Sequence, residues 1–302
     1  MKARSAIVRR AAPAALPLVL VLILAAGAGA EGTEGGSAAA PRPLYTVGSR
    51  VDWKARTLFV DVELDLAAAG LRMPEGRLEA QRMIEHDFPG LAKDAVFALQ
   101  ADSHRTVEAA VADGTLEAEG LVALSGLARP ESSSLSKDMR KFKASYGIGL
   151  EAVMALFLSG ARPTPIRAPL ESRPTRDYSG IVIYAKGRLP VHGEGVDGKA
   201  APCLFPRVYD GEMRLLLDRS AVAPEVLAAG GSTGGVLGYA AAMGVEAGER
   251  VGGDPMRVMA VELFGDARCD YVISRDDALA ILSSPGNREL LRQGKVVVIL
   301  DF

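Results

Sequence analysis

The sequence is poor in aromatic and reactive residues. Its 302 residues include one tryptophan, three histidines and two cysteines, and aromatic residues make up 5%. So few aromatics argue against a carbohydrate platform or a stacking surface for single-stranded nucleic acid. Two cysteines exclude a disulfide-dense small domain, and a content of 49% hydrophobic and 24% charged residues excludes a disordered or collagenous chain. The length suits one large domain or two small ones.

The first thirty residues have the composition of a signal peptide. An apolar stretch over 16–26 is followed by small residues ending at Ala30, and it is preceded by the cations Lys2, Arg4, Arg9 and Arg10. This order is typical of secretory signals, so we expect export to the periplasm and cleavage after Ala30. The alternative is an uncleaved membrane anchor, because residues 11–30 carry no charge and nearly suffice to span a bilayer.

Cleavage would remove four cations and no acid, so the formal net charge would change from −2 to −6. A mildly acidic chain offers no basic footprint for nucleic acid or anionic lipid. We also expect no lipid anchor, because lipid attachment requires a cysteine directly after the apolar stretch and the first cysteine is Cys203.

The two cysteines, Cys203 and Cys269, would lie in an oxidising compartment after export. They either form one disulfide or lie in the core as small buried thiols. Neither has a histidine or a second cysteine at ligand spacing, so we predict no metal site there.

The pattern along the chain predicts two α+β domains, each with helices packed on a mostly antiparallel sheet. The first contains a hairpin over 50–53 and 57–64, a helix over 74–102 that Pro89 kinks or splits, and short helices over 106–113 and 116–127. A long strand over 134–148 and a helix over 150–158 follow. The predicted boundaries are a signal peptide at 1–30, a Gly/Ala/Ser/Pro-rich tether at 31–43 and an N-terminal domain at 44–160.

Four prolines between Ala161 and Thr175 predict a linker over 161–175, because proline sustains neither helix nor ladder hydrogen bonds. The C-terminal domain then covers 176–302. Its pattern predicts strands over 180–185, 256–264 and 296–300 and a hairpin over 204–210 and 213–218. Two helices are expected, over 275–284 and over 287–292, with Asn287 as the cap of the second.

Gly230-Gly231-Ser232-Thr233-Gly234 matches the G-x-S-x-G pattern of serine hydrolases. That fold places its histidine after the serine, whereas no histidine follows His192 here. We therefore expect Ser232 to lie in an exposed loop with no imidazole near it and predict no catalytic residues. The hydrolase hypothesis would require His192 or His104 to reach Ser232.

The three histidines, His86, His104 and His192, have no ligand spacing among them, and we predict neither a metal site nor a cofactor. Asp276 and Asp277 lie where a helix begins and are expected to interact with its dipole.

Several segments carry a resemblance to known proteins. In the first half they are 51–53, 74–80 and 99–103, and in the second half 177–183, 204–210, 253–255, 272–278 and 295–301. These segments resemble FlgT-type flagellar ring proteins and related small bacterial outer-membrane lipoproteins. The resemblance implies a periplasmic, envelope-associated protein without known catalytic residues. The missing anchoring cysteine departs from the lipoprotein members of that group.

These observations predict a non-enzymatic interaction or assembly module of the bacterial envelope, with envelope or flagellar proteins as its partners. Two alternatives stay open, a periplasmic small-ligand-binding protein and a serine hydrolase using Ser232. A closed apolar pocket between the domains would favour the first alternative, and an exposed apolar patch would favour the assembly module. The sequence does not indicate the oligomeric state.

Overall fold

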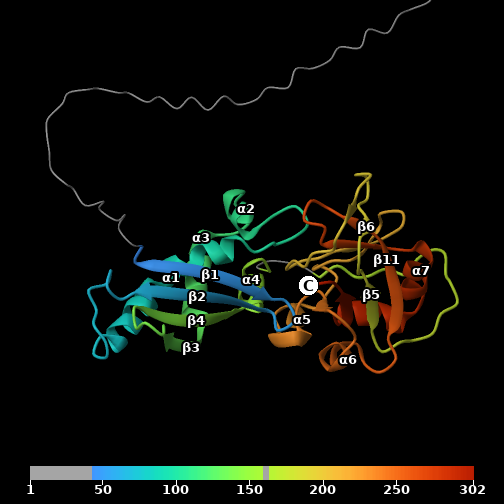
Figure 1. The fold of residues 1–302 in the computed structure, drawn as a ribbon. Coiled ribbons are helices and arrows are strands. Elements are labelled where there is room, and N and C mark those ends of the chain that lie inside the picture. Colours follow the sequence, from blue (N-terminus) through green and yellow to red (C-terminus); the bar gives the residue numbers. More distant parts are fainter. Residues whose placement is uncertain (1–42, 159–162) are drawn as a thin grey trace, which may run out of the picture. The chain divides into compact units, whose positions relative to one another are not determined.

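The computed structural model describes residues 43–158 and 163–302. The expected signal peptide, its cleavage site and the tether up to Arg42 lie outside the described residues. Within the described part, two separate sheets form two α+β domains (Figure 1), as the sequence predicts. No helix in this part is both long and apolar enough to span a membrane.

The N-terminal domain is built on a four-stranded antiparallel sheet in the order β1-β2-β4-β3. Its strands are β1 (Tyr45–Asp52), β2 (Thr57–Asp65), β3 (Arg129–Leu135) and β4 (Lys141–Gly149). Apolar and polar residues alternate along β2, as in a strand with one buried face. The buried face consists of Leu58, Val60, Val62 and Leu64. The predicted first hairpin is thereby confirmed, with β1 five residues longer at its start.

One face of this sheet is covered by α1 (Arg77–Phe97), which packs on β2 and β4 (Figure 1). The helix continues through Pro89, so the expected split does not occur. Its buried stripe repeats every three or four residues at Ala80, Ile84, Phe88, Ala92, Ala95 and Val96. The rings of Phe88 and Tyr146, 4.4 Å apart, join helix and sheet.

Shorter helices complete this domain. They are α2 (Val107–Ala112), α3 (Ala118–Leu124), the 3-10 turn η1 (Ser125–Leu127) and α4 (Leu150–Leu156). The Thr106 side chain accepts a hydrogen bond from Ala109 N and so caps α2. Each of these helices was predicted within a few residues.

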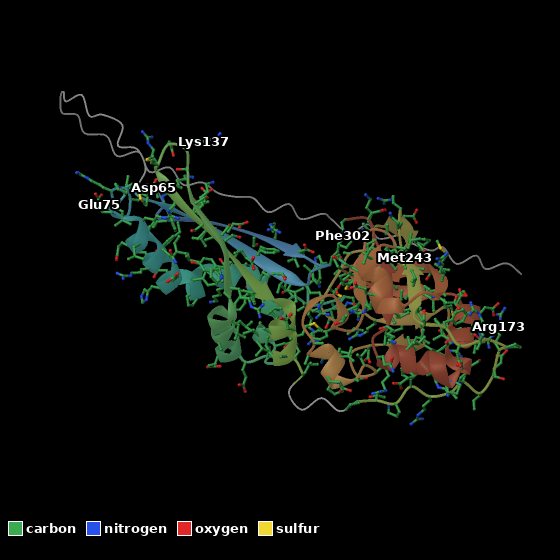
Figure 2. All side chains as sticks on the ribbon, turned by 90° about the horizontal axis from the view of Figure 1, so that it is seen from below. Asp65, Glu75, Lys137, Arg173, Met243 and Phe302 are labelled. Carbon is green, nitrogen blue, oxygen red and sulfur yellow. The ribbon has the colours of Figure 1, made fainter. Side chains whose placement is uncertain are left out.

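The prediction of one long strand over 134–148 was wrong. The segment contains the end of β3, a tight turn and β4, which pair with each other. The turn is closed by Asp138, whose carboxylate accepts hydrogen bonds from the Ser136 hydroxyl and from Arg140 N, while Met139 takes a positive φ of 54°. Lys137 in this turn lies at the same end of the sheet as Asp65 (Figure 2).

The C-terminal domain contains a seven-stranded sheet in the order β10-β13-β5-β11-β12-β8-β9. Its strands are β5 (Ile181–Tyr184), β8 (Val208–Asp210), β9 (Leu215–Leu217), β10 (Gly238–Ala240), β11 (Met256–Phe264), β12 (Asp270–Ile273) and β13 (Val296–Ile299). A small separate ladder joins β6 (Leu189–Pro190) to β7 (Asp197–Gly198).

This sheet is mixed, which corrects the expectation of a mostly antiparallel one. The pairs β10/β13, β13/β5, β5/β11 and β12/β8 are parallel, and only β11/β12 and β8/β9 are antiparallel. The fully apolar strands at 181–183 and 296–299 are typical of parallel strands covered on both faces. The sequence analysis missed β10 and α6 (Val245–Val251), whose glycine- and alanine-rich surroundings carry little periodicity. It also missed β12, which has only four residues.

The remaining helices of this domain are α5 (Pro224–Leu227), η2 (Gly231–Thr233), α7 (Arg275–Ser283) and α8 (Pro285–Arg292). Ser274 caps α7 by accepting from Asp277 N, so Asp276 and Asp277 do lie in its first turn. The prediction that Asn287 caps α8 was wrong, because Ser284 has that role. Asn287 is buried instead, where it accepts from Tyr178 N and donates to Arg176 O.

The proline-rich segment has neither helix nor strand over the described residues 163–180. It is tied to the C-terminal domain by hydrogen bonds that Thr164 N donates to Ser220 O and Arg173 N donates to the Ser283 hydroxyl. The domain boundaries stay a prediction.

The two domains share a hydrophobic core and a hydrogen-bonded loop. The rings of Phe157 and Phe205 lie 5.3 Å apart, and Leu204 N and Phe205 N donate to the carbonyls of Gln100 and Ala101. Asp270 is fully buried and accepts hydrogen bonds from the Ser103 hydroxyl at 2.7 Å and from Arg207 N at 2.8 Å. The loop over 100–105 thus docks the N-terminal domain on β12.

We expect the stability of Asp270→Asn relative to wild type to increase as the pH rises above the ordinary pKa of an aspartate. Burial raises the pKa of Asp270 and the charge of Asp102 adds to this, although the bonds from Ser103 and Arg207 and the Arg207 charge oppose it. A carboxyl whose pKa is raised on folding favours the folded state while protonated, and this contribution is lost as the pH rises through the folded pKa. Urea denaturation of both proteins at several pH values measures the difference, in which the other groups cancel. A pH-independent difference would contradict the expectation.

Candidate functional site

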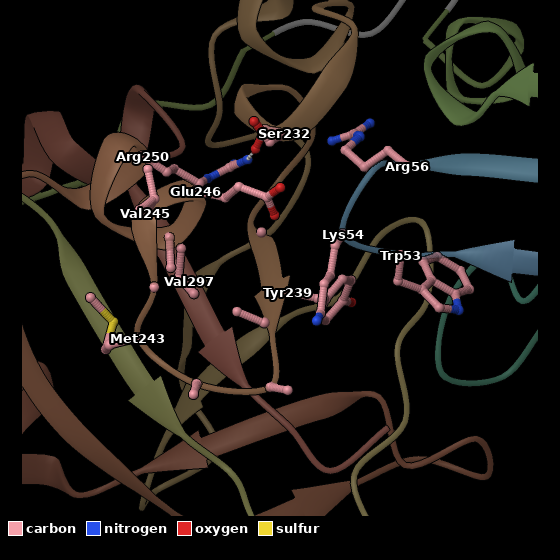
Figure 3. A pocket seen from close by; sticks show the side chains of 16 residues that line it. Trp53, Lys54, Arg56, Ser232, Tyr239, Met243, Val245, Glu246, Arg250 and Val297 are labelled. Carbon is pink, nitrogen blue, oxygen red and sulfur yellow. Dashed lines mark hydrogen bonds between the residues drawn. The ribbon is translucent and has the colours of Figure 1, made fainter.

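A cavity of about 380 Å³ lies where the β1–β2 turn of the N-terminal domain meets β10, α6 and the glycine segment 230–235 (Figure 3). The turn is shaped by Asp52, whose carboxylate oxygen accepts from Lys54 N and Ala55 N. Arg56 closes the turn with a positive φ of 54°, and its carbonyl accepts from Leu150 N. The turn therefore directs the Lys54 and Arg56 side chains to the domain junction.

The aromatic part of the cavity wall is formed by Trp53 and Tyr239. Their rings meet edge to face, with centroids 5.9 Å apart. The Tyr239 hydroxyl donates to Cys203 O and accepts from Cys203 N, and burial raises its pKa, so it stays a neutral phenol. Trp53 is half-buried.

The glycine segment folds around a buried arginine. The Arg250 guanidinium donates to four carbonyl oxygens, those of Ser232, Gly234, Gly235 and Gly294, at 2.7–3.1 Å. Glycine is required at 234 and 235, because a Cβ there would lie 1.8 Å from Ala229 O and 1.9 Å from Arg56 Nη1. Of the two glycines that the hydrolase pattern specifies, this packing accounts for Gly234.

Arg56 is the second buried arginine, and it lacks comparable partners. Its side chain is only 6% exposed, its Nε has no hydrogen-bond partner, and its Nη2 donates to the Met154 sulfur at 2.9 Å. Among the described residues no carboxylate lies within ion-pair distance of it. Burial lowers the pKa of Arg56, while the more distant charge of Glu151 opposes this. A buried charge without a paired counter-charge costs a folded protein several kcal/mol.

The cavity has an excess of positive charge. The charged residues that line it are Lys54, Arg56, Arg250 and one acid, Glu246. Burial lowers the pKa of Arg250, and repulsion from the neighbouring charge of Arg56 lowers it further. Figure 3 shows Arg56 extending toward the segment that carries Ser232. The arrangement is suited to binding a negative group.

The structure places Ser232 on the wall of this cavity, in the turn η2. It is half-buried rather than exposed, which corrects the expectation of an exposed loop, because Arg250 holds the segment through its carbonyls. His192 is hydrogen-bonded to Glu262 at 2.6 Å and His104 lies 3.3 Å from Asp266. Both imidazoles contact the Phe264 ring, and no hydrogen bond in the described part of the chain joins either of them to Ser232.

We expect a fluorophosphonate probe to leave the mature protein unlabelled. A nucleophilic serine needs a base within about 3 Å. The two histidines that the hydrolase hypothesis would require, His192 and His104, are engaged by Glu262 and Asp266 beside Phe264. Labelling is read by gel fluorescence against a known serine hydrolase. Labelling that Ser232→Ala abolishes would contradict this expectation and revive the hydrolase hypothesis.

The other candidate residues of the sequence analysis are the two cysteines and His86, and none of them lines the cavity. Cys203 and Cys269 are both buried as free thiols, and burial together with a hydrogen bond to Cys269 raises the pKa of Cys203. His86 is exposed on α1. Residues 43–158 and 163–302 contain no group of three or more histidine, cysteine or acidic side chains that would hold a metal ion. Arg56 and Arg250 were missed by the sequence analysis, since no local pattern distinguishes a buried arginine from a surface one.

The fold and the cavity define a two-domain α+β protein with a cationic cavity at the domain junction. Two family models match this chain in the same order. That of the N-terminal domain of Treponema pallidum Tp0624 matches residues 45–156, from the start of β1 to the end of α4, and that of its second domain matches residues 180–302. The matches indicate a two-domain protein of the Tp0624 type, and neither links the chain to FlgT-type proteins. No curated protein matches the chain.

Proposed function

We propose that this chain is an exported, non-enzymatic interaction module of the bacterial envelope that binds its partner through an uncovered face of the C-terminal sheet. Parallel strands are normally covered on both faces. Here α6 covers β10, β13 and part of β5 through a small cluster that includes Val182, Ala247 and Val297. The same face continues onto β11, where no helix of the described residues covers it and alternate side chains are exposed.

The observation that carries the proposal is the exposure of Met259 and Val261 on β11. They are 60% and 42% exposed, and Met259 pairs in register with the half-buried Tyr184 at the edge of the covered cluster. Met243, labelled in Figure 2, packs against the same cluster. Exposed apolar surface on a sheet face typically marks a protein interface. Arg257 is exposed on this face as well, which favours a partner with an apolar centre and an acidic rim.

Envelope or flagellar proteins are the partners that this proposal implies, with no nucleic acid, lipid anchor or cofactor involved. The proposal includes a periplasmic location, which the signal-like sequence at residues 1–30 supports. N-terminal sequencing of protein from the native envelope should begin at Glu31, and an intact Met1 terminus would contradict export through a cleaved signal.

The proposal is tested with the double variant Met259→Lys and Val261→Lys. Two cations buried in the interface would oppose docking of an apolar partner. The amount of partner that this variant retains from envelope extracts should therefore be at least tenfold lower than the amount that the wild-type chain retains. Val47→Lys is a matched control, since Val47 is 40% exposed on the N-terminal sheet. Circular dichroism should show all three proteins equally folded. Equal retention by both variants would contradict the proposal.

The alternative of a small-ligand-binding protein is favoured by one observation, the junction cavity with its unpaired Arg56. That cavity and the β11 face are formed by different residues, so the two sites are testable independently. A hydrophobic ligand would require a closed apolar pocket. This cavity differs from such a pocket, because three cations line its wall.

A further inference from the structure

The strongest unexplained feature of the molecule is the Arg56 guanidinium at the domain junction. It is more than nine-tenths buried, yet its Nε–H has no acceptor and its Nη2 faces only the Met154 thioether. Thioether sulfur is a weak acceptor, whereas a guanidinium suits the paired oxygens of a carboxylate or phosphate. The chain itself supplies no such group within ion-pair distance in its described residues.

Arg250 is also buried beside this cavity, but its guanidinium group has hydrogen-bond acceptors. Four of its five N–H groups are directed at carbonyl oxygens, which leaves one N–H on Nη2. Its charge nevertheless adds to the positive potential of the cavity. Lys54 extends from the same turn as Arg56 and is exposed, and its Nζ lies 5.8 Å from the centroid of the Phe302 ring.

We propose that the junction cavity binds one oxyanion, a phosphate or carboxylate group, with Arg56 as the principal ligand and Lys54 as a second cation. The cavity volume of about 380 Å³ is enough for such a group together with a small attached moiety. Binding would bring a counter-charge to Arg56 and would reduce the repulsion between the two guanidinium groups. The site joins the two domains, because the cations come from the β1–β2 turn and the glycine segment comes from the C-terminal domain.

Glu246 and Glu151 limit what the cavity accepts. Glu246 lies on its wall, whereas Glu151 lies outside the cavity and acts on Arg56 from the side of α4. Both acids repel a ligand with several negative charges spread over its surface. The proposal is therefore a single oxyanion group, not a polyanion.

The test is isothermal titration of the mature chain with inorganic phosphate and, in a second arm, with acetate, at constant ionic strength set with potassium chloride. We expect saturable one-to-one binding in at least one arm, and the arm that binds more tightly identifies the oxyanion. Arg56→Met should weaken binding at least tenfold, and Lys54→Met by a smaller factor. Arg219→Met is the matched control, since Arg219 is also partly buried but lies outside the cavity, and it should bind as wild type does.

Three results would overturn the proposal: no saturable binding in either arm, equal binding by wild type and a folded Arg56→Met, or equal loss in the Arg219→Met control. If Arg56→Met does not fold, the exposed Lys54→Met provides the comparison, and unchanged binding there would count against the site. This outcome is independent of the β11 face, because Met259 and Val261 do not line the cavity.

Discussion

Arg250→Met should lower the free energy of unfolding by about 3 kcal/mol, because it leaves four carbonyl oxygens without their donor. Each orphaned buried group costs about 1–3 kcal/mol, and the relief from removing a buried charge offsets part of the sum. The carbonyls of Ser232 and Gly234 belong to the glycine segment, so the cavity wall should lose its order as well. Urea denaturation measures the change.

Two control variants separate this effect from a general loss of charge. Arg219→Met removes a partly buried arginine that stacks on the Phe205 ring without a network of carbonyls, and it should cost less than about 1 kcal/mol. Arg250→Lys keeps the charge and at most three donors, so an intermediate loss is expected. A loss for Arg250→Met no larger than for Arg219→Met would contradict the role given to Arg250.

Oxidative refolding should join Cys203 to Cys269 and raise the free energy of unfolding by about 4 kcal/mol on the chain-entropy model. The two thiols are buried together, and the hydrogen bond to Cys269 contributes to the raised pKa of Cys203. In the reaction, oxidised glutathione accepts two electrons from the thiols and is released as two reduced molecules. Urea denaturation with and without reductant measures the difference.

The double variant Cys203→Ala and Cys269→Ala is the control and should unfold identically in both conditions. Since burial raises the pKa of Cys203, the folded protein should react slowly and refolding should be required for rapid oxidation. Two free thiols in the denatured protein after oxidative refolding would contradict the pairing and support the alternative of separate buried thiols.

The sequence predicts the fold well where periodicity is strong. On β2 one face is buried, so apolar and polar residues alternate in the sequence. On β13 both faces are buried, so the sequence is a continuous apolar run. The prediction fails where a short polar turn interrupts an alternating pattern, as at Asp138 between β3 and β4. They also occur where short strands such as β10 are defined by their neighbours, since its pairing with β13 is a long-range contact.

The candidate site is less accessible to prediction than the fold. The glycine segment is visible in the sequence, but its role depends on Arg250, which follows it by fifteen residues and reaches back to its carbonyls. Arg56 enters the junction only because the two domains meet there. A buried cation leaves no periodic signal, so its burial has to be observed in three dimensions. The exposure of Met259 likewise has to be observed in three dimensions, because it depends on how far α6 extends over the sheet.

The most direct test of the interaction module is photo-crosslinking in living cells, with a benzophenone amino acid at position 261 of the full chain. The account predicts a crosslinked adduct of defined mass from position 261 and none from the matched position 47. It also predicts loss of the adduct when Met259→Lys is added, because a cation at that position opposes an apolar contact. An identical adduct pattern from both positions, or an adduct at 261 that Met259→Lys leaves unchanged, would contradict the proposal that the face of β11 is the binding surface.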